Sequence, residues 1–166
     1  MERILALLET GVEVNMLITV CDIVKPLYGD EETHGMPHVL AVLKRALNMK
    51  AYFKLDIPTP QIIVASLCHD IFALQDRKNH HILGAQWVKE HASELGLHDD
   101  DVEAVSHAIL HHRASTLKEG TDSRGLAALI SAADRDEPDF DKLVMRVWEC
   151  ASDPIMGSKL DTIRLS

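Results

Sequence analysis

The sequence predicts an all-α fold, a single-domain compact helical bundle of about six to eight helices. Its 166 residues suffice for one hydrophobic core, and 46% of them are apolar. Aromatic residues make up only 4%, and the large apolar residues are mostly Leu, Ile, Val and Met. This composition favours packed helices over sheets. Because no internal repeat, low-complexity tract or long linker interrupts the chain, we predict one domain over 1–166.

The first two predicted helices cover 2–10 and 12–27. The first stops near Gly11, a residue that disfavours helix interiors. The second has apolar residues at helical spacing and closes at Pro26 and the run 28–30.

The next two predicted helices cover 36–49 and 59–72. Pro37 suits the first turn of the earlier one. Between them, 54–60 holds two prolines and is predicted to be a loop. The later helix is apolar on all sides, which predicts a central position in the bundle.

The second half of the chain predicts four more helices. One covers 79–95 and ends at Gly96, a good C-terminal stop. The next covers 99–113, and its three initial aspartates suit the positive end of the helix dipole. The last two cover 123–135 and 139–151.

Charge and cysteine usage limit the functions that we expect. The formal net charge is −9, which does not suit broad nucleic-acid binding but still allows a small phosphorylated ligand. The three cysteines show no CxxC spacing, as expected of reduced thiols in a cytoplasmic protein. The apolar stretch 12–24 is too short and too polar to cross a membrane. Apolar terminal helices leave a homodimer open.

The ten histidines are the unusual feature of the composition. Many of them fall with aspartates among apolar helical residues, where a buried charge without a partner is costly. A divalent transition metal is the simplest shared partner, and imidazole with carboxylate suits Mn, Fe, Co, Ni or Zn without any Cys. The polar clusters are 34–38, 68–70, 79–85 and 107–112, followed by Asp134.

The adjacent pair His69-Asp70 is the most informative of these clusters. Consecutive helical residues point about 100° apart. At a helix end they can still converge on one ion, and an aspartate there can bridge two ions with its two oxygens.

In this order, the motifs resemble the H…HD…D signature of the HD-domain metal-dependent phosphohydrolase superfamily, most strongly over 33–140. The terminal element LISAADRDEP resembles that of bacterial symmetric diadenosine tetraphosphate hydrolases. The other elements that carry the resemblance are HGMPHVLAVLKRA, VASLCHDIF, HILGAQ and AILHHRA.

The resemblance implies one or two metal ions per chain, with Asp70 bridging them where there are two. A first ion would be held by His38, His69, Asp70 and Asp134. A second would be held by His81 and one or both of His111 and His112. The family's Gly-Lys after HD-Ile is absent here, where the run is Phe72-Ala73-Leu74, and so is the Gly-Tyr-Pro of cyclic-di-GMP phosphodiesterases after the double histidine.

The implied reaction is hydrolysis of a phosphate ester or anhydride, expected to be that of a nucleotide, by a metal-bound hydroxide. Asp70 would bridge metals or orient the hydroxide, and an unligated histidine such as His34, His80 or His107 would protonate the leaving oxygen. The side chains expected to contact the substrate are Arg77, Lys78, Arg135 and His107.

Structural alternatives stay open for several of these residues. His81 could be a core histidine that donates to a backbone carbonyl. His107 could support a ligand or merely be solvated, and Arg135 could pair with a neighbouring carboxylate. Two other functions also stay open: a di-iron oxygenase of the HD type, and a non-catalytic metal-stabilised module that binds a nucleotide or a partner protein. Substrate and metal identity are not readable from the sequence.

Overall fold

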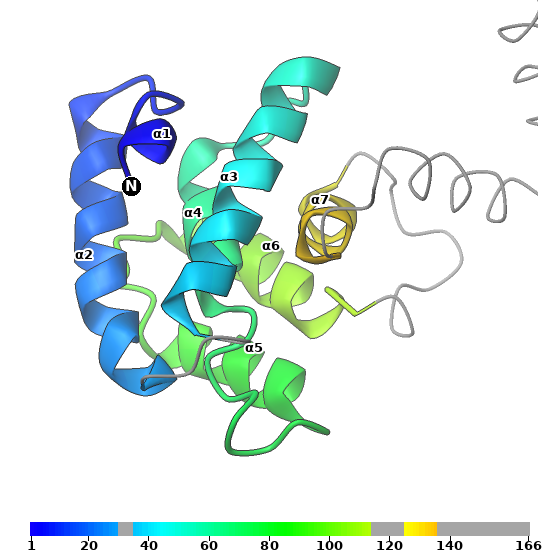
Figure 1. Cartoon of the computed structure of the whole chain (residues 1–166). Helices are drawn as coiled ribbons and strands as arrows, with labels where there is room; N and C mark the ends of the chain where they lie inside the picture. Colours follow the sequence, from blue (N-terminus) through cyan, green and yellow to red (C-terminus); the bar gives the residue numbers. More distant parts are fainter. Residues whose placement is uncertain (30–34, 114–124, 136–166) are drawn as a thin grey trace, which may run out of the picture. The chain divides into compact units, whose positions relative to one another are not determined.

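The computed structural model describes residues 1–29, 35–113 and 125–135. Within these residues the chain forms seven α-helices and no strand (Figure 1). The predicted all-α class is therefore confirmed. The predicted last helix, 139–151, lies outside the described residues.

By its internal contacts the chain divides into two compact units, Met1–Asp134 and Arg135–Ser166. All seven helices lie in the first unit. Of the second unit only Arg135 is described, so a single domain over the whole chain stays a prediction.

The first two helices differ from their predicted bounds because of a capping box. α1 covers only Glu2–Leu5, and α2 covers Gly11–Tyr28. The Thr10 side chain accepts from the Glu13 backbone amide, and the Glu13 carboxylate accepts from the Thr10 amide. This exchange satisfies free amides at a helix start, so the chain begins α2 at the glycine that was predicted to end a helix. α2 also continues two residues past Pro26.

The next two helices meet at the candidate site. α3 covers Met36–Phe53, with Pro37 in its first turn as predicted, and ends at Lys54 in a left-handed conformation (φ 52°). α4 covers Thr59–Cys68. It ends four residues before its predicted bound, and the chain continues as turns through Asp70.

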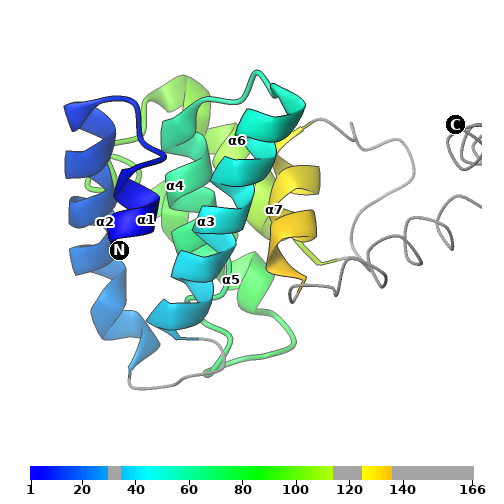
Figure 2. The same cartoon turned by 45° about the horizontal axis from the view of Figure 1, so that its top comes forward.

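α4 is the central helix of the bundle, as its apolar sequence predicted. It contacts α2, α3, α6 and α7, and all but two of its residues are buried. Figure 2 shows it enclosed by its neighbours. With ten residues it is far too short to span a bilayer, and none of the helices in the described ranges combines the length and apolarity that spanning requires.

The remaining helices complete the bundle around the end of α4. α5 covers His80–Glu90, α6 covers Asp99–Leu110, and α7 covers Leu126–Asp134. α5 ends five residues before its predicted bound, since the chain passes through turns from its end to Gly96, which has a positive φ of 71°. A glycine suits that conformation because it has no Cβ.

α5 approaches α4 closely through Gly84. A Cβ placed there would lie 3.3 Å from the Cys68 carbonyl oxygen and 3.3 Å from Ile109 Cγ2 on α6. Both contacts are tighter than ordinary van der Waals contact. The glycine therefore lets the start of α5 reach the end of α4.

Candidate metal centre

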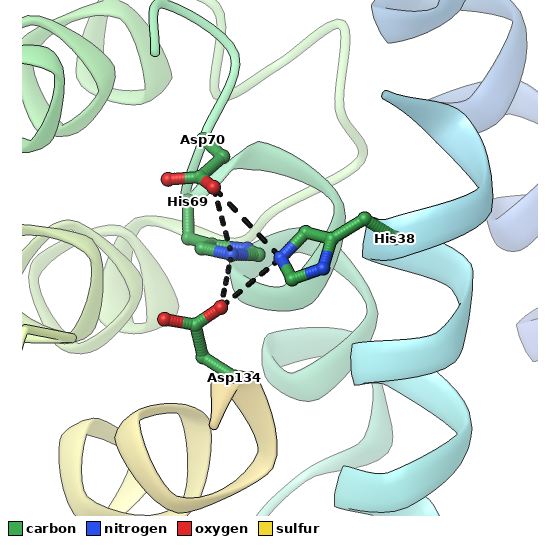
Figure 3. A group of neighbouring side chains, drawn as sticks. All are labelled: His38, His69, Asp70 and Asp134. Atoms are coloured by element: carbon green, nitrogen blue, oxygen red, sulfur yellow. Dashed lines mark hydrogen bonds and ion pairs between the residues drawn. The ribbon is translucent and has the colours of Figure 1, made fainter. Parts of the chain in front are cut away.

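Four side chains that are far apart in the sequence converge at one point. Figure 3 shows His38 from the first turn of α3, His69 and Asp70 after the end of α4, and Asp134 from the last residue of α7. Each offers one ligand atom, and these four atoms lie within 4.8 Å of one another. We call these four residues the first group.

Asp134 is the closest partner of both histidines in the first group. Its Oδ1 lies 3.1 Å from His38 Nε2 and 3.2 Å from His69 Nε2. Asp70 Oδ2 faces the same nitrogens at 3.8 and 3.7 Å. Two ligands of one cation, each about 2.1 Å from it, lie about 3.0–3.5 Å apart, so the spacing fits a shared cation.

A second group adjoins the first and shares Asp70 with it. It consists of Asp70, His80 from the first residue of α5, and His112 just after α6. Asp70 Oδ1 lies 3.1 Å from His80 Nε2 and 3.6 Å from His112 Nε2. Asp70 therefore turns Oδ2 toward the first group and Oδ1 toward the second.

Three of the four histidines are held in the tautomer that a metal requires. In each, Nδ1 contacts a backbone carbonyl oxygen, which can only accept, so Nδ1 carries a hydrogen and a neutral ring keeps its lone pair on Nε2. The contacts are from His69 to Ser66 at 2.8 Å, from His80 to Arg77 at 2.9 Å and from His112 to Ile109 at 2.7 Å.

The second group contains a contact that a cation would resolve. His80 Nε2 and His112 Nε2 lie 3.3 Å apart, and with both rings neutral and Nδ1 protonated, two lone pairs face each other. Either a proton or a cation must lie between them. The donor set of both groups, imidazole nitrogen and carboxylate oxygen, suits divalent transition metals.

Burial and charge shift the acidities within the centre in opposite directions. Burial lowers the pKa of His69, but the charges of Asp70 and Asp134 outweigh this and raise it to about 9. Burial, together with the nearby His69, lowers the pKa of His112 to about 4. For Asp70 and Asp134 burial raises the pKa, but the surrounding histidines outweigh it and hold both values well below the ordinary range.

The centre opens to solvent on the side of the first group. The Asp134 side chain is 27% exposed and that of His38 14%. The His80 and Asp70 side chains are each 7% exposed, and that of His112 2%. Water and a ligand can therefore reach the first group directly, while the second lies deeper.

The structure brings His80, not the predicted ligand His81, to the second group. α5 begins at His80, and the next residue along a helix turns about 100° away. The His81 ring lies edge-on to His80 with the centroids 5.6 Å apart, and its Nδ1 is buried without a hydrogen-bond partner in the described residues. Burial lowers the pKa of His81.

Of the predicted pair at the end of α6, the structure brings His112 into the second group and leaves His111 outside it. His111 packs instead against the exposed ring of His107, with centroids 4.5 Å apart. His107 is likewise outside both groups.

The other predicted substrate-contacting residues lie in the segment before α5 or at the limit of the described residues. Arg77 and Lys78 are exposed in the segment between α4 and α5. Arg135 directly follows Asp134 in the chain, and His34 lies outside the described residues.

Sequence reasoning missed Arg113, which donates through Nη1 to the Lys78 carbonyl oxygen at 3.2 Å. Its charge also reaches His81. Arg113 thus joins the end of α6 to the segment that carries Arg77 and Lys78. The signal in the sequence was a basic residue directly after the double histidine.

The helical bundle and the convergent histidines and aspartates place the chain in the class of all-helical proteins with a candidate metal centre. A family model described as HD domain matches residues 35–139. Because this match covers more than half of the chain, the protein belongs to the HD-domain superfamily of metal-dependent phosphohydrolases, as the motifs indicated. No curated protein and no solved structure matches the chain significantly.

Proposed function

We propose that this protein hydrolyses a phosphate ester or phosphate anhydride of a nucleotide, with two divalent transition-metal ions held at the two groups. Family membership supports metal-dependent phosphate hydrolysis. The nucleotide part rests on the likeness of 129–138 to the terminal element of diadenosine tetraphosphate hydrolases.

The observation that carries the proposal is the division of Asp70 between the two groups. Its Oδ2 faces His38 and His69, and its Oδ1 faces His80 and His112. An aspartate with histidines on both sides is suited to bridge two cations. Two-cation sites are typical of phosphodiester and phosphoanhydride cleavage, so we favour these reactions over monoester cleavage.

In this proposal the side chains of the centre bind the cations and orient the phosphate. Bound cations would lower the pKa of a coordinated water and neutralise the charge that grows on the phosphoryl oxygens. His38 and Asp134 form the exposed side at which a phosphate arrives. Arg77 and Lys78 lie in the segment directly before His80, and the charge of Arg113 reaches the adjacent His81.

His80 takes a different role from the one that the sequence suggested. With its Nε2 3.1 Å from Asp70 Oδ1 and its Nδ1 against the Arg77 carbonyl, it holds the second cation and leaves no free nitrogen to protonate a leaving oxygen. His107 lies exposed and outside both groups, and it could supply that proton only to a substrate that reaches across α6.

The test combines elemental analysis with an activity panel. The purified protein is expected to carry up to two transition-metal ions per chain, and to hydrolyse at least one nucleotide phosphodiester or dinucleoside polyphosphate when Mn, Co, Ni, Mg or Fe is added. An Asp70→Asn variant removes the shared ligand and should lose both ions and at least about 100-fold in activity. An absence of metal-stimulated turnover across the panel, in protein that is metal-loaded, would refute the proposal.

A further inference from the structure

Tyr28, the last residue of α2, reaches into the end of α4. Its side chain is buried, with 1% of the residue exposed. Its hydroxyl donates to the Leu67 carbonyl oxygen at 2.8 Å. The backbone of Asp70 also lies near this hydroxyl. Tyr28 thus touches the chain on both sides of His69.

The bond from Tyr28 to Leu67 falls where the helical pattern of α4 breaks. In a continuing helix the Leu67 carbonyl would accept from the Ile71 amide. Instead that amide contacts the Cys68 carbonyl at 3.4 Å, and the Ser66 carbonyl, which would accept from the Asp70 amide, takes Nδ1 of His69. The hydroxyl pairs the Leu67 carbonyl that the break releases.

We propose that the Tyr28 hydroxyl is a positioning residue for the metal centre, inserted into the end of α4 so that the adjacent His69 and Asp70 face the same point. This inference rests on the proposed function in that it assigns metal binding to both residues. In an unbroken helix their side chains would diverge by about 100°. Here Nε2 of His69 and Oδ2 of Asp70 lie 3.7 Å apart.

The surroundings keep the hydroxyl in its donating form. Burial, together with the charges of Cys68 and Asp70, raises the pKa of Tyr28 well above its ordinary value. This direction agrees with a hydroxyl that donates to the Leu67 carbonyl.

The test is Tyr28→Phe, which removes the hydroxyl and keeps the ring. Partners that orient metal ligands typically change metal affinity by about 10–100-fold when removed. We expect the variant to bind Mn²⁺ or Co²⁺ at least about 10-fold more weakly in competition with a chelator. The visible absorption of bound Co²⁺ should also change, because the ligand geometry at His69 and Asp70 changes.

Two control variants separate positioning from stability. Tyr52→Phe makes the same change at the only other tyrosine, which is 81% exposed on α3, and should bind metal like the unmodified protein. Val20→Ala weakens the packing of the same helix at a fully buried residue without touching the hydroxyl. It should lower stability while keeping metal affinity and the Co²⁺ spectrum.

The outcomes distinguish this inference from the proposed function. If the unmodified protein binds metal but hydrolyses nothing, the function fails while the affinity comparison still judges Tyr28. An affinity of Tyr28→Phe within twofold of the unmodified protein, with the same Co²⁺ spectrum, would overturn the inference. So would equal losses of affinity in Tyr28→Phe and Val20→Ala.

A measurement on the unmodified protein covers the case in which Tyr28→Phe does not fold. The Tyr28 hydroxyl proton should exchange slowly with solvent, because the hydroxyl is buried and donates to the Leu67 carbonyl. Exchange of this proton as fast as that of the exposed Tyr52 hydroxyl would show that the bond is not maintained, and would overturn the inference.

Discussion

The two groups of the candidate metal centre share Asp70 and otherwise differ in charge and access. The first combines two carboxylates with two imidazoles and lies partly open to solvent. The second combines the shared carboxylate with two imidazoles and is nearly closed. With Asp70 shared, the first group still has Asp134 to itself, whereas the second has no carboxylate of its own, so the first offers a divalent cation more negative charge. The first group is therefore the better place for a tightly held ion that meets substrate.

The same contrast shows in the histidines. His69 lies between two carboxylates, which raise its pKa to about 9 against the effect of burial. His112 lies just as deep, but burial and the charge of His69 lower its pKa to about 4. Without metal, His69 in the first group thus holds an additional proton at neutral pH, whereas His112 in the second group does not. A cation must displace that proton to bind at the first group.

The largest difference between the two groups is expected in the activity that remains when one ligand is removed from each. In His38→Ala the first group loses a ligand, and activity should fall more than about 100-fold; in His80→Ala the second group loses one, and activity should fall about 10–100-fold. Each variant should retain about one metal ion per chain by elemental analysis. The exposed His98, changed to Ala, serves as control. Higher activity in His38→Ala than in His80→Ala would reverse our ranking.

In the metal-free protein, the free energy of unfolding should depend on pH through residues of the first group. Because the folded pKa of His69 is raised from 6.5 to about 9, its contribution is fully present below pH 6.5 and is lost as pH rises through about 9. That loss is about 3 kcal/mol of unfolding free energy. Asp70 and Asp134 have lowered pKa values, so their contribution is present above pH 3.8 and lost as pH falls below it.

Urea unfolding of chelator-treated protein between pH 3 and 10 measures both losses. Metal-loaded protein is the control, since His69 bound to a cation carries no proton on Nε2 and should show no alkaline loss. A metal-free protein with constant stability from pH 6.5 to 9.5 would contradict the prediction.

The smallest effect is expected from Gly84→Ala, which should shift α5 and with it His80 of the second group. The new Cβ would lie 3.3 Å from the Cys68 carbonyl. The helix propensity gain of about 1 kcal/mol is outweighed by about 1–3 kcal/mol of overpacking. We expect a net loss of about 1 kcal/mol, and a few-fold weaker binding of the second ion as α5 shifts.

The matched control is Gly11→Ala, where a Cβ meets nothing within 4 Å. It should leave stability equal or slightly higher in the same urea titration. Equal effects of the two substitutions would show that the close approach of α5 to α4 does not hold the second group.

The helices were predictable because their signals are local. Apolar spacing predicted α2 and α3, and the all-apolar sequence of α4 predicted its central position. The helix bounds were less predictable. The capping box of Thr10 and Glu13 starts α2 at Gly11, because a satisfied capping box stabilises a helix start more than one N-terminal glycine destabilises it.

The first group was also predictable, since the spacing of His38, His69-Asp70 and Asp134 carried a family signature. The choice between His80 and His81 was not. It depends on the residue at which α5 starts, and a difference of one residue rotates the side chain by about 100°. The bond from Tyr28 to Leu67 was out of reach too, since 39 residues separate its ends and no periodicity encodes such a contact.

The division of Asp70 has a consequence for how the protein fills with ions. With two ions, as we propose, a cation that draws on the carboxylate leaves less negative charge for its neighbour, and two adjacent dications repel each other. Loading should therefore proceed stepwise, with a half-filled form that persists over a range of ion supply. Catalytic capacity would then follow metal availability in the cell rather than the amount of protein.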